Sequence, residues 1–213
     1  MAPKPVCVAM PPKYVHDHNL SHNNPINLET LSGIKVLSLN MAGDNVKSVT
    51  VDMGEPSLNK DDIPVVNDDG ERCMIEKSVV TPYGEYNVTA VSMGNPHGVI
   101  FVDNLEDIPF ENLGPYMENH PIWRDRANIE FAQVLSSGVI KMRVWERGTG
   151  ETLACGTGAC ATLVASAITG RTGRMATLKL RGGDLDIEWM ADGHVMMTGA
   201  ATEVFQGVYR RQC

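Results

Sequence analysis

Short alternations of apolar and polar residues, separated by turn residues, occupy most of the chain after residue 30. The stretches at 34–40 and 46–52 alternate on either side of Gly43-Asp44-Asn45, a pattern typical of a β-hairpin. Further strands are predicted at 86–93, 99–102, 129–135, 139–145, 178–181, 185–190 and 195–198. Because short turns join neighbouring strands that run in opposite directions, the pattern predicts a mostly antiparallel sheet.

A helical pattern is clear only between about residues 159 and 169, where apolar side chains occur on nearly every side of the turn. Gly170 follows at the position that favours a C-terminal cap. A helix that is apolar all round has to be covered on all sides, and in a chain of strands the cover is a sheet. We therefore predict the α+β class, with a mostly antiparallel sheet wrapped around a central helix.

The first 26 residues follow neither period. Prolines at positions 3, 5, 11, 12 and 25 interrupt this segment, and His16, His18 and His22 lie close together after Cys7. We expect an irregular N-terminal arm over residues 1–26. We predict no metal site there, because the spacing of the ligands is loose and no acidic second shell is evident.

Acidic residues exceed basic ones in this chain of 213 residues, with 26 Asp and Glu against 18 Lys and Arg and a formal net charge of −8. The hydrophobic content of 43% is that of an ordinary soluble globular protein. A general nucleic-acid binder needs a basic surface to replace the counterions of phosphate, so we expect no nucleic-acid partner. The longest uncharged stretch, 153–170, is too short and too polar to span a membrane comfortably, and we expect no membrane partner.

Five cysteines are scattered along the chain, at positions 7, 73, 155, 160 and 213. They form no CxxC pair of the zinc-binding type, and a disulfide framework would be sparse for this length. The first residues contain no apolar block long enough for a secretory signal. A reducing, cytoplasmic location is therefore predicted.

Three segments carry polar residues that a fold alone does not require. One is 93–98 (MGNPHG), which contains Asn95 and His97 between two predicted strands; as a purely structural element it is a glycine-rich turn. A second is the loop residue Asn128. The third is 145–160 (WERGTGETLACGTGAC), which leads from a strand into the predicted helix.

Cys155 in the third segment lies just ahead of the predicted helix, where backbone N–H groups and the helix dipole favour negative charge. We therefore expect its thiol to ionise more easily than a free one. The amides of 156–158 can hold a carboxylate, because the two glycines let a ligand approach the backbone. Glu146 and Arg147 add a carboxylate and a guanidinium nearby. A buried cysteine among packing glycines is the structural alternative, and it suits Cys160 better.

Two other kinds of chemistry fit parts of this pattern. A glycine-rich loop before a helix also suggests phosphate binding, but no lysine follows the glycines and no Walker or dinucleotide pattern is present. A hydrolase that pairs Cys155 with His97 remains open at this stage.

The run 146–162, with 94–97 upstream, closely resembles the diaminopimelate epimerase family. Segments 30–34, 51–56 and 204–209 are similar to that family as well, so the resemblance extends from about residue 27 to the C-terminus. Proline racemases are similar in fold and chemistry, but their cysteine loop usually follows a different lead-in. The phenazine-biosynthesis isomerases of the same fold lack the cysteine.

The resemblance implies an isomerase that needs no cofactor and interconverts LL- and meso-diaminopimelate in lysine and peptidoglycan precursor biosynthesis. In such an enzyme two pseudo-symmetric lobes flank a cleft, and each lobe offers one cysteine. One thiolate removes the α-proton of the amino acid, and a thiol on the opposite face returns a proton. The family also suggests a homodimer.

Carried over by motif, Cys155 is one of the two acid/base cysteines. Glu146 and His97 match the polar groups that position the substrate and poise the thiols. Gly156 and Thr157 would hold the α-carboxylate at the reacting end. The positions that match substrate-binding residues of the family are Asn95, Asn128, Glu146, Arg147, Gly156 and Thr157.

The family's other cysteine lies in an N-terminal Cys-Gly-Asn-Gly loop, whereas Cys155-Gly156 is the only Cys-Gly pair in this sequence. A second cysteine would have to come from another polypeptide or from Cys7, whose surroundings offer no helix terminus. We expect residues 27–58, rejoined by 203–213, to form a remnant of the first lobe and 59–202 to form the second, cysteine-bearing lobe. The alternatives to an epimerase of this specificity are a non-catalytic chain that binds an amino acid or a protein partner, and another amino-acid racemase of the same fold.

Overall fold

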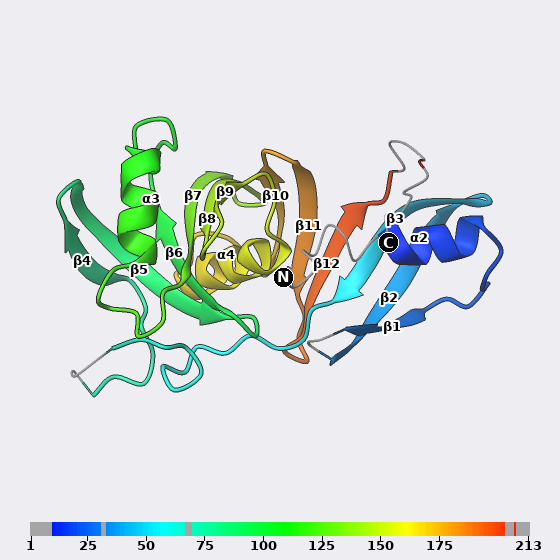
Figure 1. Cartoon of the computed structure of the whole chain (residues 1–213), viewed down its shortest axis with the longest axis horizontal. Coiled ribbons are helices and arrows are strands. Elements are labelled where there is room, and N and C mark those ends of the chain that lie inside the picture. Colours follow the sequence, from blue (N-terminus) through cyan, green and yellow to red (C-terminus); the bar gives the residue numbers. More distant parts are fainter. Residues whose placement is uncertain (1–9, 31–32, 67–69, 203–206, 208–213) are drawn as a thin grey trace, which may run out of the picture.

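The computed structural model of the chain describes residues 10–30, 33–66, 70–202 and 207. Its strands form one 12-stranded sheet (Figure 1). In spatial order they are β1 (Ile26–Thr30), β2 (Gly33–Ala42), β3 (Asn45–Asp52), β12 (Val195–Ala200), β11 (Gly183–Trp189), β10 (Met175–Leu180), β8 (Val139–Glu146), β7 (Asn128–Ser136), β6 (Pro96–Phe101), β5 (Gly84–Ser92) and β4 (Lys77–Thr81), with β9 (Gly150–Thr152) paired to β8 off this path.

Most neighbouring strands in this sheet are antiparallel, and the β2–β3 pair is the hairpin predicted around Gly43. The pairs β6–β7 and β8–β10 are parallel. Each parallel connection passes through a helix, α3 (Phe110–Glu118) between β6 and β7 and α4 (Gly156–Ile168) between β8 and β10. The predicted mostly antiparallel arrangement is therefore confirmed.

Helix α4 lies at the centre of the sheet's curvature and packs against β5, β6, β7, β10, β11 and β12. Ten of its residues are buried, and they come from every side of the helix. Gly170 follows α4 in the left-handed conformation at φ +72°, as predicted for its C-terminal cap. The α+β class with a central helix is confirmed, although α4 begins three residues earlier than the sequence pattern indicated.

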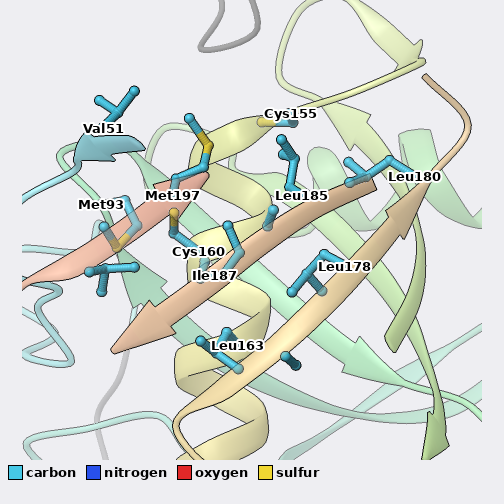
Figure 2. Packing of buried hydrophobic residues seen from close by; sticks show 14 of the residues in the cluster. Val51, Met93, Cys155, Cys160, Leu163, Leu178, Leu180, Leu185, Ile187 and Met197 are labelled. Atoms are coloured by element: carbon cyan, nitrogen blue, oxygen red, sulfur yellow. The ribbon is translucent and has the colours of Figure 1, made fainter. Parts of the chain in front are cut away.

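Two hydrophobic clusters form the core. One joins α4 to β3 and to β10–β12, and Figure 2 shows Cys160 and Leu163 of α4 facing Leu178 and Ile187 of the sheet. All four of these residues are fully buried. The second cluster joins α3 to the strands β4–β7. The first cluster fixes the position of α4 and therefore the position of the cysteine that precedes it.

The sequence pattern missed α3 because its Gly114 and Pro115 are signals that normally break a helix. Tertiary packing explains why a helix forms there. A Cβ atom on Gly114 would lie 2.7 Å from Trp145, so only glycine lets α3 approach the sheet this closely. Residue 114 is thus a contact point between layers, which the sequence alone does not reveal.

The prediction of an irregular arm over residues 1–26 is wrong for residues 10–17, whereas residues 18–25 belong to no helix or strand. Residues Met10–Asp17 form helix α2, which packs on β2 and β3. Pro11 and Pro12 are compatible with it because they lie in the first turn, where backbone N–H groups have no intrahelical acceptor. The Asn24 side chain then exchanges two hydrogen bonds of 2.9 Å with the backbone of Leu39 and leads into β1.

The strand pair β3–β12 joins the segment predicted as a remnant of the first lobe to the sheet around α4. The predicted boundaries between lobes remain a prediction, and most of the segment 203–213 lies outside the described residues. Cys7 and Cys213 also lie outside them. Among the residues that the structure describes, no helix is both long enough and apolar enough to cross a membrane.

Candidate active site

Cys155 is the N-cap residue of α4, with an extended backbone at φ −136° and ψ 109°. Its carbonyl oxygen accepts the first helical hydrogen bond, from the Ala159 N–H, at 2.9 Å. The N–H groups of Gly156, Thr157 and Gly158 consequently have no acceptor within the helix. The predicted placement of a thiol at a helix N-terminus is confirmed, and those amides give the same spot its affinity for anions.

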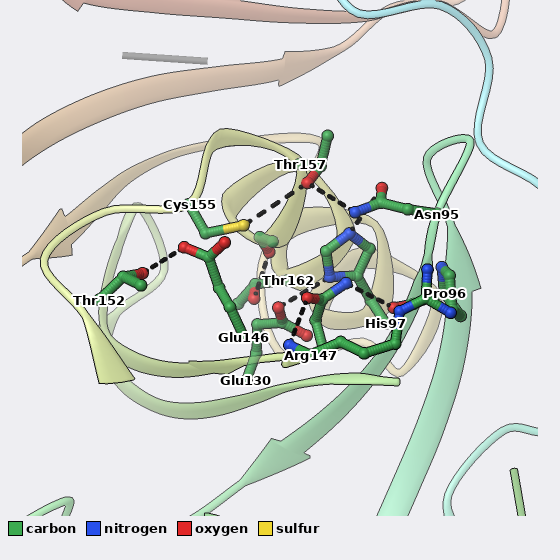
Figure 3. Close-up of polar contacts among 12 residues, drawn as sticks. Asn95, Pro96, His97, Glu130, Glu146, Arg147, Thr152, Cys155, Thr157 and Thr162 are labelled. Atoms are coloured by element: carbon green, nitrogen blue, oxygen red, sulfur yellow. Dashed lines mark hydrogen bonds and ion pairs between the residues drawn. The ribbon is translucent and has the colours of Figure 1, made fainter. Parts of the chain in front are cut away.

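A chain of hydrogen bonds runs from this thiol into the core (Figure 3). The sulfur of Cys155 lies 3.5 Å from the Thr157 hydroxyl, which accepts a bond of 3.3 Å from the Asn95 side-chain amide. The carbonyl oxygen of Asn95 lies 3.1 Å from Nε2 of His97. Nδ1 of His97 lies 2.7 Å from Oε1 of Glu130. Residues predicted from two separate segments, 93–98 and 145–160, therefore meet in one network.

The strand arrangement explains this meeting. Gly94, at φ +86°, allows the tight turn that leads from β5 into β6 and places Asn95 beside α4. His97 is the second residue of β6 and pairs in parallel register with Asn128 of β7. Successive side chains of a strand point to opposite faces, so the side chain of Glu130, two residues beyond Asn128, also points toward α4.

Glu146, the last residue of β8, approaches the same thiol from the other side. Figure 3 shows its carboxylate next to the sulfur of Cys155. The Thr152 hydroxyl donates a hydrogen bond to Oε1 of Glu146 across the β8–β9 pair. Two carboxyl groups, those of Glu130 and Glu146, thus act electrostatically on Cys155.

Asn128 and Arg147 are joined to each other beside this network. Oδ1 of Asn128 accepts the backbone N–H of Arg147 at 3.0 Å, and its Nδ2 donates to the Pro96 carbonyl at 2.9 Å. Asn128 is buried, so it ties β6 to the turn after β8. The guanidinium of Arg147 donates to the backbone and side chain of Asp125. Their contacts with a substrate remain a prediction.

The expectation that Cys155 ionises easily is wrong for this state of the protein. Burial, the largest cause, and the charges of Glu130 and Glu146 together raise the pKa of its thiol to about 12. The Thr157 hydroxyl and the Gly158 amide lower the pKa, but by less. Only 4% of Cys155 is exposed, so loss of water outweighs the helix terminus. The resting group is therefore a thiol.

A direct cysteine–histidine pair is absent among these residues. Both ring nitrogens of His97 are engaged, one with Glu130 and the other with Asn95, and the ring is completely buried. His97 reaches Cys155 only through Asn95 and Thr157. The geometry therefore lacks the nucleophile–base contact of a cysteine hydrolase, which the sequence had left open.

No sequence pattern predicted a role for Glu130 or Thr152. Glu130 carried a detectable signal, because it is the one charged residue in the apolar stretch 129–135. A charge inside a strand that faces a buried helix needs a partner, and His97 is that partner. Thr152 had no such signal, since a threonine in a short strand is unremarkable.

Within residues 10–30, 33–66, 70–202 and 207, no group of three or more His, Cys, Asp or Glu side chains is arranged to hold a metal ion. A pocket of about 470 Å³ lies between the end of α2 and the β2–β3 turn, and His16, His22 and Asp44 are among its lining residues. It contains none of the predicted site residues.

The chain is similar to known proteins of one family. Residues 89–204 match the family model described as diaminopimelate epimerase. A diaminopimelate epimerase from Methanococcus maripaludis strain C6 is 48% identical over 196 residues, which are 92% of this chain and 70% of the relative. A diaminopimelate epimerase from Acetivibrio thermocellus is 53% identical over 196 residues, covering 92% of this chain and 69% of the relative.

Solved structures share the fold at low sequence identity. A probable proline racemase from Agrobacterium radiobacter superposes with a TM-score of 0.65 at 12% identity, covering 93% of this chain and 65% of that one. A hydroxyproline epimerase from Agrobacterium vitis gives a TM-score of 0.63 at 15% identity, covering 93% and 64%. The chain thus spans slightly less than two thirds of these structures. On the strength of the family match and the curated relatives, the chain belongs to the diaminopimelate epimerase family of isomerases.

Proposed function

We propose that this chain acts in the interconversion of LL- and meso-diaminopimelate, with Cys155 as one of the two acid/base groups at the α-carbon. The observation that carries the proposal is the position of the Cys155 thiol, which caps α4 in contact with Thr157 and beside Glu146. The names of the curated relatives supply the substrate. From the family we also propose a homodimer and a place in lysine and peptidoglycan precursor biosynthesis in the cytoplasm.

The N-terminus of α4 is the proposed site for the α-carboxylate of the substrate. Backbone amides of Gly156 and Thr157 point out of the first turn, and a helix terminus favours an anion there. The α-ammonium group would lie toward the carboxylate of Glu146. With the α-carboxylate and the α-ammonium group held in this way, the α-carbon faces the sulfur of Cys155. Asn95, Asn128 and Arg147 are proposed to recognise the remaining polar groups.

The raised pKa of Cys155 suits it to act as the acid. In that direction the S–H bond breaks, its proton forms the new C–H bond at the α-carbanion, and the electron pair of the S–H bond stays on sulfur. In the reverse direction the thiolate removes the α-proton. A bound ammonium group near Glu146 and Cys155 offsets the carboxylate charges, so substrate binding lowers the thiol pKa when a base is needed.

Inversion requires a second acid on the opposite face of the α-carbon, because one thiol reaches only one face. This sequence has one Cys-Gly pair, and the chain spans about 70% of the length of its curated relatives. We therefore assign to Cys155 the proton transfer on one face and separate that step from inversion in the test.

Proton exchange in D2O tests the proposal. The chain is incubated separately with LL-diaminopimelate, meso-diaminopimelate, L-proline and trans-4-hydroxy-L-proline, and deuterium at the α-carbon is followed by mass spectrometry. We expect deuterium in diaminopimelate and none in the two prolines. Exchange confined to a proline would replace the proposal with a racemase of that substrate. No exchange with any of the four, in chain shown to be folded, would leave a binding role and overturn the proposal.

Chiral chromatography of the same samples reports on the second face. Exchange without a change in the LL to meso ratio means that Cys155 works on one face alone. Exchange with inversion means that a second acid is present. Both results support the role of Cys155, provided that exchange disappears in Cys155→Ala and persists in Cys160→Ala.

A further inference from the structure

Glu130 is a buried carboxylate that the proposed reaction does not use. Its side chain and that of His97 are each 0% exposed, and their 2.7 Å contact links β7 to β6. Oε2 of Glu130 is buried with no hydrogen-bond partner. A carboxylate that gives up water without full replacement is costly, and proteins keep such groups mainly where they are needed.

The fold makes room for this carboxylate at the first turn of α4. A Cβ atom on Gly158 would lie 2.5 Å from Oε1 of Glu130. Glycine at 158 therefore lets the carboxyl group pack directly against the helix backbone, close to the terminus that Cys155 caps. Glu130 and Cys155 thus occupy the inner and outer sides of the same helix end.

The hydrogen-bond donors and acceptors of the network determine how many protons the Glu130–His97 pair holds. The Asn95 amide directs its nitrogen to Thr157 and its oxygen to Nε2 of His97. An amide oxygen only accepts, so Nε2 must carry a proton. Nδ1 faces Glu130, so the proton between them lies on one of the two. In either case the pair holds one proton more than a carboxylate and a neutral imidazole together.

The direction of the remaining bonds follows from that proton. Thr157 accepts from Asn95, so its own hydroxyl proton is free to point toward the sulfur of Cys155. Loss of the shared proton leaves His97 neutral with Nδ1 donating to Glu130, and Nε2 then accepts. The Asn95 amide must turn over, and Thr157 must donate to it instead of to the sulfur.

We propose that Glu130 is a positioning residue, which shares one buried proton with His97. That proton sets the direction of the hydrogen bonds through Asn95 and Thr157, so that the Thr157 hydroxyl donates toward Cys155. Glu130 acts through these residues and does not touch the substrate. The inference rests on the proposed function only where it concerns catalysis. Its tests use the protein without substrate and are therefore independent of that function.

Several titratable groups surround this chain of hydrogen bonds. They are His97 of β6, Glu146 at the end of β8, and Cys155 and Cys160 at α4. A charge on the Glu130–His97 pair therefore acts on the ionisation of Cys155. Substitution of Glu130 removes one member of that couple, whereas Glu146 and both cysteines stay in place.

The first arm of the test is NMR of the full chain labelled with ¹⁵N-histidine. The ring signals of His97 are assigned by their loss in His97→Gln. We expect Nε2 of His97 to carry a proton at neutral pH, and we expect that proton to be lost in a titration at higher pH. A bare Nε2 at neutral pH overturns the inference.

The second arm is the rate of Cys155 alkylation by iodoacetamide across a pH series, read by peptide mass. In the wild type we expect two ionisations, so that the rate rises by less than about tenfold per pH unit once the shared proton leaves. Glu130→Gln removes the carboxylate that shares the proton, so this variant lacks the second ionisation. Its alkylation rate should rise about tenfold per pH unit to a single midpoint. A purely structural role would change the rate by one factor at every pH and leave the shape unaltered.

Glu118→Gln is the matched control. Glu118 is also buried, but it accepts from the Trp145 indole and the Gly148 amide and is not part of the chain to Cys155. It should keep the two-ionisation curve of the wild type. A curve of the same shape in wild type and Glu130→Gln overturns the inference. The NMR arm decides the question if Glu130→Gln fails to fold, because it needs no Glu130 variant.

Discussion

The first turn of α4 and the remainder of the same helix provide two different environments for a cysteine. Cys155 caps the helix next to Thr157 and Glu146, whereas Cys160 lies one and a half turns further on and is completely enclosed by apolar side chains. Burial raises the pKa of both thiols. Burial therefore does not distinguish them. The difference lies in the polar partners, which only the first turn supplies.

This contrast assigns separate tasks to the two parts of the helix. The apolar part anchors α4 in the sheet, and substitutions there should lower the free energy of unfolding. The first turn presents groups to a reacting carbon, and substitutions there should lower the rate of α-proton exchange.

Leu163→Ala should produce the largest loss of stability. Leu163 is fully buried in the apolar part of α4, and truncation of such a side chain leaves a cavity that costs about 2–5 kcal/mol of unfolding free energy. Urea unfolding followed by circular dichroism measures the change. Exchange activity per folded molecule should stay close to that of the wild type. A specific loss of activity in fully folded Leu163→Ala would contradict the separation of tasks.

Gly158→Ala should affect both properties, because residue 158 lies where the two parts meet. Its new Cβ atom would lie 2.5 Å from the buried Glu130 carboxylate, and overpacking of this kind costs about 1–3 kcal/mol. Gly173→Ala is the control, since no atom lies within 4 Å of its added Cβ. Equal unfolding midpoints for the two variants would show that the carboxylate does not pack against α4.

Glu146→Gln should make Cys155 more reactive without substrate. The negative charge of Glu146 raises the pKa of the Cys155 thiol, so its removal lowers that pKa and increases the thiolate fraction at a given pH. Iodoacetamide should label Cys155 roughly threefold to tenfold faster. Labelling of Cys160, measured in the same digest, should not change. Faster labelling of both cysteines would indicate loosened packing instead of an electrostatic effect.

The smallest effect is expected away from α4, at the junction of β3 with β12. Hydrogen bonding to Asp52 raises the pKa of His194 above 6.5. Burial raises the pKa of Asp52, but the bonds from His194 and the Gly54 amide outweigh it and hold the pKa below 3.8. The His194 contribution is present below its unfolded pKa and is lost as pH rises through the folded value. The Asp52 contribution is lost as pH falls through its lowered pKa.

The Asp52–His194 pair therefore stabilises the fold most at pH values between the unfolded pKa of aspartate and the unfolded pKa of histidine, in mildly acidic solution. His194→Gln should lower the melting temperature more in mild acid than in mild alkali, as measured by calorimetry at two pH values. A uniform decrease at both pH values would show that the contact is not electrostatic. The exchange activity of the folded variant should stay unchanged.

Local signals explain what the sequence alone could predict. The β2–β3 hairpin and α4 both follow from short-range patterns, namely alternation around Gly43 and an apolar run that ends at Gly170. The position of Cys155 ahead of α4 also follows from sequence neighbours. These features depend on residues close together in the chain, so an accurate prediction needs no knowledge of tertiary contacts.

Long-range contacts explain the failures. Gly114 and Pro115 are residues that normally break a helix, but packing against Trp145 makes them part of α3. The network from Cys155 to Glu130 requires the parallel pairing of β6 with β7, which no local pattern reveals. The high pKa of the Cys155 thiol could not be predicted for the same reason. A helix terminus is visible in the sequence, whereas the burial that outweighs it is not.

The central claim is that the first turn of α4, and not the cysteine content of the helix, carries the proton transfer. The most direct test compares α-proton exchange of LL-diaminopimelate in D2O by wild type, Cys155→Ala and Cys160→Ala, with folding of each checked by circular dichroism. We predict a loss of at least about a hundredfold for Cys155→Ala and a change within about threefold for Cys160→Ala. Equal exchange by wild type and folded Cys155→Ala would contradict the account.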